Sequence, residues 1–215
     1  HATTPRNRCT TPVLLRAAPP PPPPMARATA NLAKTLWTTG WLGWWTQSAL
    51  TAVSAVLLLF ANSVARATID APSLVGRYLA LAALAASTVS TFSSWMYTRM
   101  AKRFRRKGLG AADAARRTTD AIGMASKVSL LGMGLGLVGA EAIVGTLAAR
   151  ALVQGPAIVY GAGGAAAAAP LQALDVLVVQ ANTNTLVSCF CGLLSTMRLR
   201  RAAERCATSA DEQIV

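Results

Sequence analysis

Histidine and acidic side chains are scarce in this chain. Its 215 residues include a single histidine, His1, and only eight aspartates and glutamates. Without histidine, no nucleophile–base arrangement for covalent catalysis is present, and the sequence contains no Walker A motif. We therefore predict that the chain is not an enzyme and needs no cofactor, while the composition leaves any metal ligands unknown.

Cysteine is also sparse. The four cysteines do not suggest a disulfide framework, and two of them, Cys189 and Cys191, lie in an apolar stretch. There a cysteine usually packs as a small hydrophobic residue. Two positions apart on a helix, their side chains point about 160° away from each other. The pair is therefore not expected to chelate a metal ion.

Charge is missing from four long stretches, which together are the most informative feature of the sequence. A bilayer core about 30 Å thick is crossed by roughly 20 apolar residues in a helix. No charged residue occurs in 35–65 or 78–98, and 128–149 and 171–197 carry one each, Glu141 and Asp175. We predict an all-α integral membrane four-helix bundle. The membrane domain covers 36–201, with spans at about 41–65, 78–98, 128–149 and 171–197.

Basic residues are abundant by contrast, and the net charge is +13. They border the apolar stretches and do not interleave with aromatic side chains, as a nucleic-acid platform would require. The pattern predicts contact with the membrane lipid bilayer and its anionic head groups, and no nucleic-acid partner.

The basic residues are unevenly shared between the connections. Three lie in the first and third connections, four follow the last span, and nine lie between spans two and three. Because basic loops remain on the cytoplasm-equivalent side, both termini and the central loop are predicted to face inward. In a plastid, this side is the stroma. Residues 113–127 fit a surface helix or a solvated loop equally well, and 153–170 fit a flexible connector.

The two ends of the chain differ from the membrane domain. Residues 1–35 hold five basic residues, several threonines, a proline run at 19–24 and no acid. An arginine-rich, hydroxyl-bearing, acid-poor segment is typical of organelle transit peptides, and the prolines oppose a helix. We predict a disordered, transit-like N-terminal segment, and a short polar tail at 202–215.

Several glycines lie within the third span. Gly134, Gly136 and Gly139 form a literal G-x-G-x-x-G, but a nucleotide fingerprint needs a strand before it, and this one lies inside an apolar span. Small residues four apart allow helix backbones to approach closely. We predict that Gly132, Gly136 and Gly139 pack against neighbouring helices.

Polar residues inside the spans are the candidate functional residues. Glu141 is either a functional carboxylate or a protonated group that hydrogen-bonds a neighbouring helix. In span four, Asp175, Asn182 and Cys189 are spaced by seven and share one face, while Gln180 and Asn184 lie roughly opposite. We expect this helix to be central, its polar groups serving either as interhelical hydrogen bonds or as a translocation path. From their depths, Glu141 and Asp175 are expected to be interior neighbours.

Segments of spans three and four resemble one four-span family. They are Leu-Gly-Met-Gly at 131–134, Gly-Ala-Glu-Ala-Ile-Val-Gly at 139–145 and Ala-Leu-Asp-Val-Leu-Val-Val-Gln-Ala at 173–181. The family contains chloroplast inner-envelope proteins, described both as components of the protein translocon and as iron permeases. The likeness covers roughly 41–201. The family pattern has Gln in place of Glu141 and His in place of Cys189, and the second departure removes the best metal ligand.

The resemblance implies a function and partners. It implies a role in chloroplast protein import as a translocon-associated component of the inner envelope, within a homo-oligomer or with other inner-envelope translocon subunits. The alternatives are a permease for iron or another divalent metal, and a structural subunit that only assembles other membrane proteins.

Overall fold

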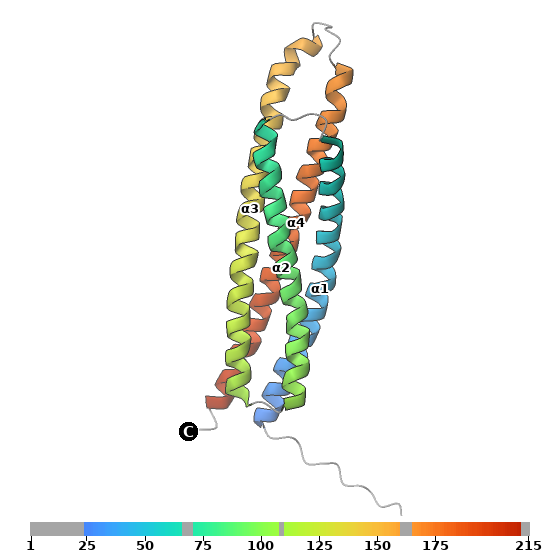
Figure 1. Ribbon diagram of the computed structural model, residues 1–215. Coiled ribbons are helices and arrows are strands. Elements are labelled where there is room, and N and C mark those ends of the chain that lie inside the picture. Colours follow the sequence, from blue (N-terminus) through green and yellow to red (C-terminus); the bar gives the residue numbers. More distant parts are fainter. Residues whose placement is uncertain (1–23, 66–70, 108–109, 160–164, 212–215) are drawn as a thin grey trace, which may run out of the picture.

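Four long helices make up the described parts of the chain. The computed structural model describes residues 24–65, 71–107, 110–159 and 165–211, and side chains over most of these ranges. The helices are α1 (Pro24–Ala65), α2 (Ala71–Lys107), α3 (Ala111–Val159) and α4 (Ala165–Asp211). All four are long and apolar enough to cross a membrane. The predicted all-α membrane bundle is confirmed, and Figure 1 shows the helices running antiparallel in chain order.

The helices form a four-sided bundle in which α4 touches all the others. Helices adjacent in the chain pack along their length, and α1 packs against α4 to close the bundle. Across the diagonals, α2 and α4 are in contact, whereas α1 and α3 barely meet. α1 begins and α4 ends at the end of the bundle where α2 is connected to α3 (Figure 1).

The helices continue beyond the predicted spans. Residues 24–35 form the start of α1, so this part of the N-terminal segment is helical. Residues 113–127 are neither a surface helix nor a loop, because they are continuous with span three in α3. The connector predicted at 153–170 is also largely helical, since α3 ends at Val159 and α4 begins at Ala165. The alanine run at 165–169 has a high helix propensity, which fits its place at the start of α4.

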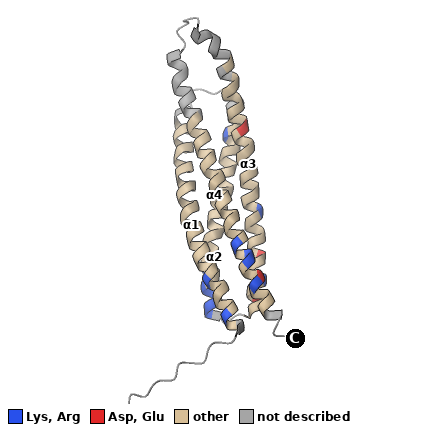
Figure 2. Ribbon diagram, turned by 180° about the vertical axis from the view of Figure 1, so that it is seen from behind, with Lys and Arg blue, Asp and Glu red and all other residues tan. Residues whose placement is uncertain are grey.

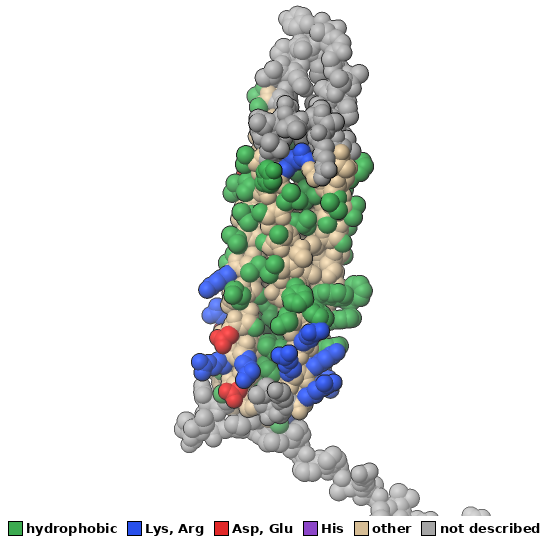
Figure 3. All heavy atoms as spheres, in the orientation of Figure 1, with side chains coloured by type: hydrophobic (Ala, Val, Ile, Leu, Met, Phe, Trp, Pro, Cys, Tyr) green, Lys and Arg blue, Asp and Glu red, His purple; other side chains and the backbone are tan. Residues whose placement is uncertain are grey.

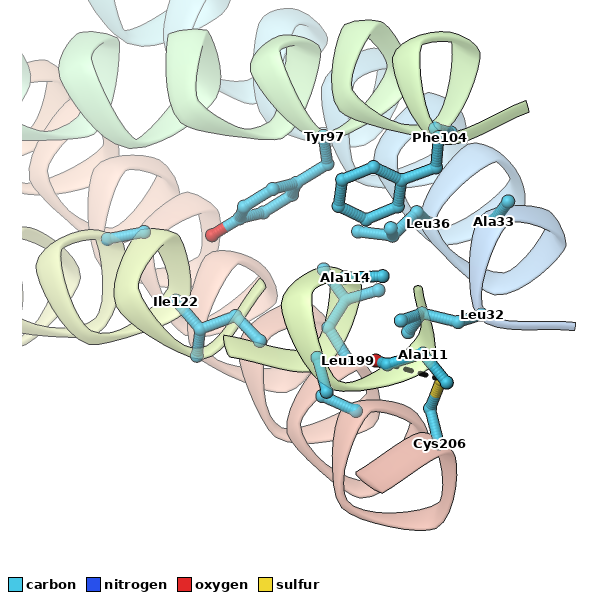
Figure 4. Close-up of a cluster of buried hydrophobic side chains, with 14 residues drawn as sticks. Leu32, Ala33, Leu36, Tyr97, Phe104, Ala111, Ala114, Ile122, Leu199 and Cys206 are labelled. Carbon is cyan, nitrogen blue, oxygen red and sulfur yellow. Dashed lines mark hydrogen bonds between the residues drawn. The ribbon is translucent and has the colours of Figure 1, made fainter. Parts of the chain in front are cut away.

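Packing explains why the helices extend past the membrane on the basic side. Buried apolar side chains from all four helices form a cluster there, including Leu36, Tyr97, Ile122 and Leu199 (Figure 4). At the opposite end, Leu58, Ala80, Ile143 and Val178 belong to a second buried cluster. Between these two clusters, the buried side chains are mostly hydroxyls and amides.

The surface divides into an apolar band and a basic end. Lysines and arginines gather where α1 begins and α4 ends, and hydrophobic side chains dominate the surface above them (Figures 2 and 3). Several tryptophans of α1 stack near this boundary, Trp37 and Trp41 with ring centroids 6.0 Å apart. Lys102 lies over the Trp37 ring. Indole rings favour the head-group region, so the boundary marks one membrane surface.

Candidate functional site

A layer of buried polar side chains fills the middle of the bundle. Gln47 of α1 is its largest member and is fully buried. The Gln47 amide nitrogen donates to Ser94 Oγ at 2.7 Å, and its amide oxygen accepts from Ser90 Oγ at 3.0 Å. Ser90 Oγ lies 2.8 Å from Ser129 Oγ of α3. One glutamine thus ties α1 to α2, and through a serine to α3.

A second set of polar side chains, three hydroxyls that contact one another, lies one turn of α1 further from the basic end. Thr51 Oγ1 lies 2.8 Å from Ser87 Oγ and 3.1 Å from Ser188 Oγ. Ser87 also donates to Ser188 at 2.9 Å. This triangle joins α1, α2 and α4. A further turn along, Ser54 Oγ donates to the Ala181 carbonyl oxygen at 2.8 Å.

A glycine makes room for the first group. A Cβ atom added at Gly192 of α4 would lie 2.5 Å from Ser90 Oγ and 2.9 Å from Ser129 Oγ. Real Cβ atoms essentially never approach other heavy atoms this closely, so the absence of a side chain at 192 allows the hydroxyls to meet. α4 thereby covers the Gln47–Ser90–Ser129 group without contributing a polar side chain to it.

The three glycines predicted to pack do lie at helix contacts. A Cβ at Gly132 would lie 2.8 Å from Cys189 Sγ, and one at Gly136 would lie 2.9 Å from Leu186 Cδ2. Gly139 faces α2 instead, where its Cβ would lie 3.2 Å from Leu79 Cβ. α3 therefore uses glycines toward both of its neighbours.

Asn182 is the only candidate carrying an unsatisfied buried atom among the described side chains. Its side chain is 1% exposed, and its amide nitrogen donates to the Gly136 carbonyl oxygen. Its amide oxygen has no hydrogen-bond partner in the described part of the chain. An unmatched buried acceptor is costly, so Asn182 has spare capacity for a ligand or a water molecule, as does the Tyr97 hydroxyl in the cluster at the basic end.

The other candidates in α4 divide between the interior and the outside. Cys189 is fully buried beside Gly132. Gln180 is exposed, and its amide nitrogen donates to the half-buried Asn184 amide oxygen at 3.2 Å along the same helix. Asp175 belongs to α4, but its side chain lies outside the described residues.

The expectation that Glu141 lies in the bundle interior is wrong. Its side chain is exposed on the outer face of α3. The reason lies in the helix geometry, because α3 turns about 100° per residue. Gly139 and Ile143 face the neighbouring helix α2 or the interior, so Glu141, midway between them in sequence, points away. The predicted interior pairing of Glu141 with Asp175 is therefore not supported.

Sequence reasoning missed much of the polar layer. Ser94, Ser129 and Gly192 were not singled out, although they surround Gln47. A usable signal was present in α2, where Ser87, Ser90 and Ser94 recur at spacings of three and four and so share one helix face.

Among the described residues, no three histidine, cysteine, aspartate or glutamate side chains come together as a metal site would require.

The comparisons with known proteins identify the family. Residues 26–203 match the family described as a protein of unknown function, DUF3611. The chain belongs to this family. The match covers all four helices except the ends of α1 and α4 and includes the whole polar layer.

One curated relative of this DUF3611 protein is Protein TIC 21, chloroplastic, from Arabidopsis thaliana. The two are 38% identical over 165 residues, which cover 76% of this chain and 54% of the relative. This chain thus spans about half the length of the curated relative that it matches. The predicted likeness to the chloroplast inner-envelope family is confirmed. No solved structure matches.

Proposed function

We propose that this DUF3611 protein is a multi-pass component of the chloroplast inner envelope that takes part in protein import as a translocon-associated subunit. Both termini then face the stroma. The observation that carries this proposal is the 38% identity to a chloroplastic TIC 21 protein. The asymmetry of the bundle supports the orientation, because its basic end holds both described chain ends.

Outward-facing polar groups support association with a partner. Glu141 of α3 and Gln180 of α4 are both exposed within candidate membrane spans. They lie at similar depth, because Asn182 of α4 bonds to Gly136 of α3. A carboxylate facing lipid tails is expensive, so the outer face of α3 around Glu141 is better covered by another protein helix than by lipid. The partner is a second copy of this chain or another inner-envelope translocon subunit.

The interior supports a packing role over an ion path. Its hydroxyls and amides bond to one another between helices, and Gly192 brings them into close contact. An ion crossing this layer would have to displace bonds that hold the bundle together. The permease alternative keeps one specific observation in its favour, the unmatched amide oxygen of Asn182.

Complementation separates the two functions. Plastids lacking their own relative would be supplied with the wild-type chain, and import of a labelled preprotein and uptake of iron would be measured in the same preparation. We expect restored import. Restored iron uptake with unrestored import would replace the translocon proposal with the permease.

The outward face is tested by Glu141→Leu. Because Glu141 is exposed, the variant should fold and melt like the wild type but lose crosslinks to its partner helix. Val138→Leu is the matched control, since Val138 is also exposed on α3 and its change keeps the surface apolar. Unchanged crosslinking by Glu141→Leu would show that the partner does not recognise the carboxylate, and no crosslink from this face in the wild type would show that the face is turned to lipid.

A further inference from the structure

Two cavities follow the seam between α1 and α4, and their linings differ. The first, of about 360 Å³, lies at the basic end and is lined by residues 28–35 of α1 and 202–209 of α4. The second, of about 130 Å³, lies deeper and is lined by residues 39–46 and 191–198 of the same helices. Because the helices are antiparallel, the two cavities succeed each other along one line.

The outer cavity has the chemistry of an anion site. Lys34 contributes a cation from α1 and Arg205 contributes one from α4, with the amide of Asn31 beside them. Leu32 and Cys206 form an apolar part of the lining. No carboxylate is among the described residues that line it. The neighbouring acid, Glu204, is held by Arg200 at 2.9 Å. A group with one or two negative charges is therefore favoured here.

The deeper cavity is suited to an apolar chain. Leu42, Gly43, Cys191 and Leu194 form the apolar part of its lining. Thr39, Thr46 and Ser195 add hydroxyls, and Arg198 adds a cation. It begins beyond Trp37, whose indole ring lies at the head-group level. Eight residues separate Lys34 from Leu42, which corresponds to about 12 Å along the helix axis. A ligand spanning both cavities has a charged end at the membrane surface and an apolar end inside.

We propose that the α1–α4 seam binds one anionic glycerophospholipid from the surrounding bilayer. Its phosphate lies between Lys34 and Arg205, and one acyl chain lies along the seam toward Leu42 and Leu194. This site lies on the α1–α4 seam, borders the polar layer at Gly43 and does not include the outer face of α3. It does not depend on the translocon proposal.

The test is a lipid titration of the full chain purified in mild detergent. Phosphatidylglycerol, phosphatidylcholine and inorganic phosphate would be added separately, and bound molecules counted by native mass spectrometry. The seam variant is Lys34→Gln with Arg205→Gln. Its control is Arg103→Gln with Lys127→Gln, which removes the same charge from exposed positions outside the seam.

The wild-type chain should retain one phosphatidylglycerol in preference to phosphatidylcholine. The seam variant should bind it about tenfold more weakly or worse, because two basic groups near the membrane surface are lost. The control should bind as the wild type does. Cys191→Leu, which fills the deeper cavity, should weaken phosphatidylglycerol binding and leave inorganic phosphate unaffected.

Three results would overturn the proposal. If the seam and control variants lost phosphatidylglycerol binding equally, the binding would depend on the overall positive charge of the protein and not on the seam. If phosphatidylcholine bound as tightly as phosphatidylglycerol, Lys34 and Arg205 would not be selecting an anionic lipid. Inorganic phosphate bound as tightly as the lipid, with no effect of Cys191→Leu on the lipid, would make the ligand a soluble anion.

Discussion

The side-chain amide of Gln47 bonds to Ser94 across the α1–α2 contact at 2.7 Å, in the middle of a membrane-spanning bundle. Both residues are at most 2% exposed. The same amide accepts from Ser90, so Gln47 uses both of its polar atoms. Together with the Thr51–Ser87 bond, Gln47 therefore fixes the depth of α1 relative to α2.

Gln47→Leu should destabilise the bundle by about 1–2 kcal/mol. Interhelical hydrogen bonds in membranes average about 0.6 kcal/mol, and the change removes two of them and takes from Ser90 and Ser94 their partner on α1. The measurement is unfolding in mixed micelles followed by circular dichroism. Gln180→Leu is the control, because Gln180 is exposed and bonds only within its own helix. Equal stability of both variants would contradict the role given to Gln47.

Gly192→Ala should be more damaging than its size suggests. The added Cβ would lie 2.5 Å from Ser90 Oγ, so the serines or α4 must move. We expect a loss of about 1–3 kcal/mol, typical of overpacking a tight interior. Gly134→Ala is the matched control, since nothing lies within 4 Å of a Cβ there. A wild-type melting curve for Gly192→Ala would show that the α4 contact is looser than described.

Asn182→Leu distinguishes the packing role of α4 from a transport role. The variant loses one hydrogen bond to Gly136 but also removes a buried acceptor that has no partner among the described residues. These effects oppose each other, so we expect a change in stability below about 1 kcal/mol. Protein import should persist. Loss of iron flux in liposomes, with the fold intact, would favour the permease.

The orientation of the bundle is open to a protease test. A cleavage site inserted after Lys107, where α2 ends, should be protected in sealed inner-envelope vesicles whose outer face is exposed. Detergent should then permit cleavage. The expectation follows from the basic residues around this connection. Cleavage in sealed vesicles would place the basic end in the intermembrane space and reverse the proposed topology.

The sequence was sufficient to predict the helices and the glycine contacts of α3. Charge-free stretches long enough to cross a membrane, and glycines four residues apart, can be interpreted from one segment without knowing its neighbours in the fold. Gly132 and Gly136 could thus be assigned to contacts without knowing which helix they meet. The extensions at the basic end were missed because they are stabilised there by packing between helices far apart in sequence, in the buried cluster that includes Leu36 and Leu199.

The side chain directions that depend on neighbouring helices were harder to predict. The prediction placed Glu141 inside the bundle because it used the depth of the residue in the membrane and not the direction of its side chain around the helix axis. Gly139 and Glu141 differ by about 200° around the helix, so both cannot face α2. The pairing of Gln47 with Ser90 and Ser94 required the depth of α1 relative to α2, which no single segment reveals. Asp175 stays a prediction, because its side chain lies outside the described residues.

The serines of α2 have a consequence for how this chain enters the membrane. If α2 were inserted alone, Ser87, Ser90 and Ser94 would have only carbonyls of their own helix as partners among the lipid tails, as Ser94 has the Ser90 carbonyl. Thr51 and Gln47 of α1 meet these hydroxyls directly. Insertion of α1 and α2 as a preformed pair therefore gives these hydroxyls partners on a neighbouring helix. The contacts between α1 and α2 thus favour a helical hairpin of these two helices as the first unit to enter the membrane.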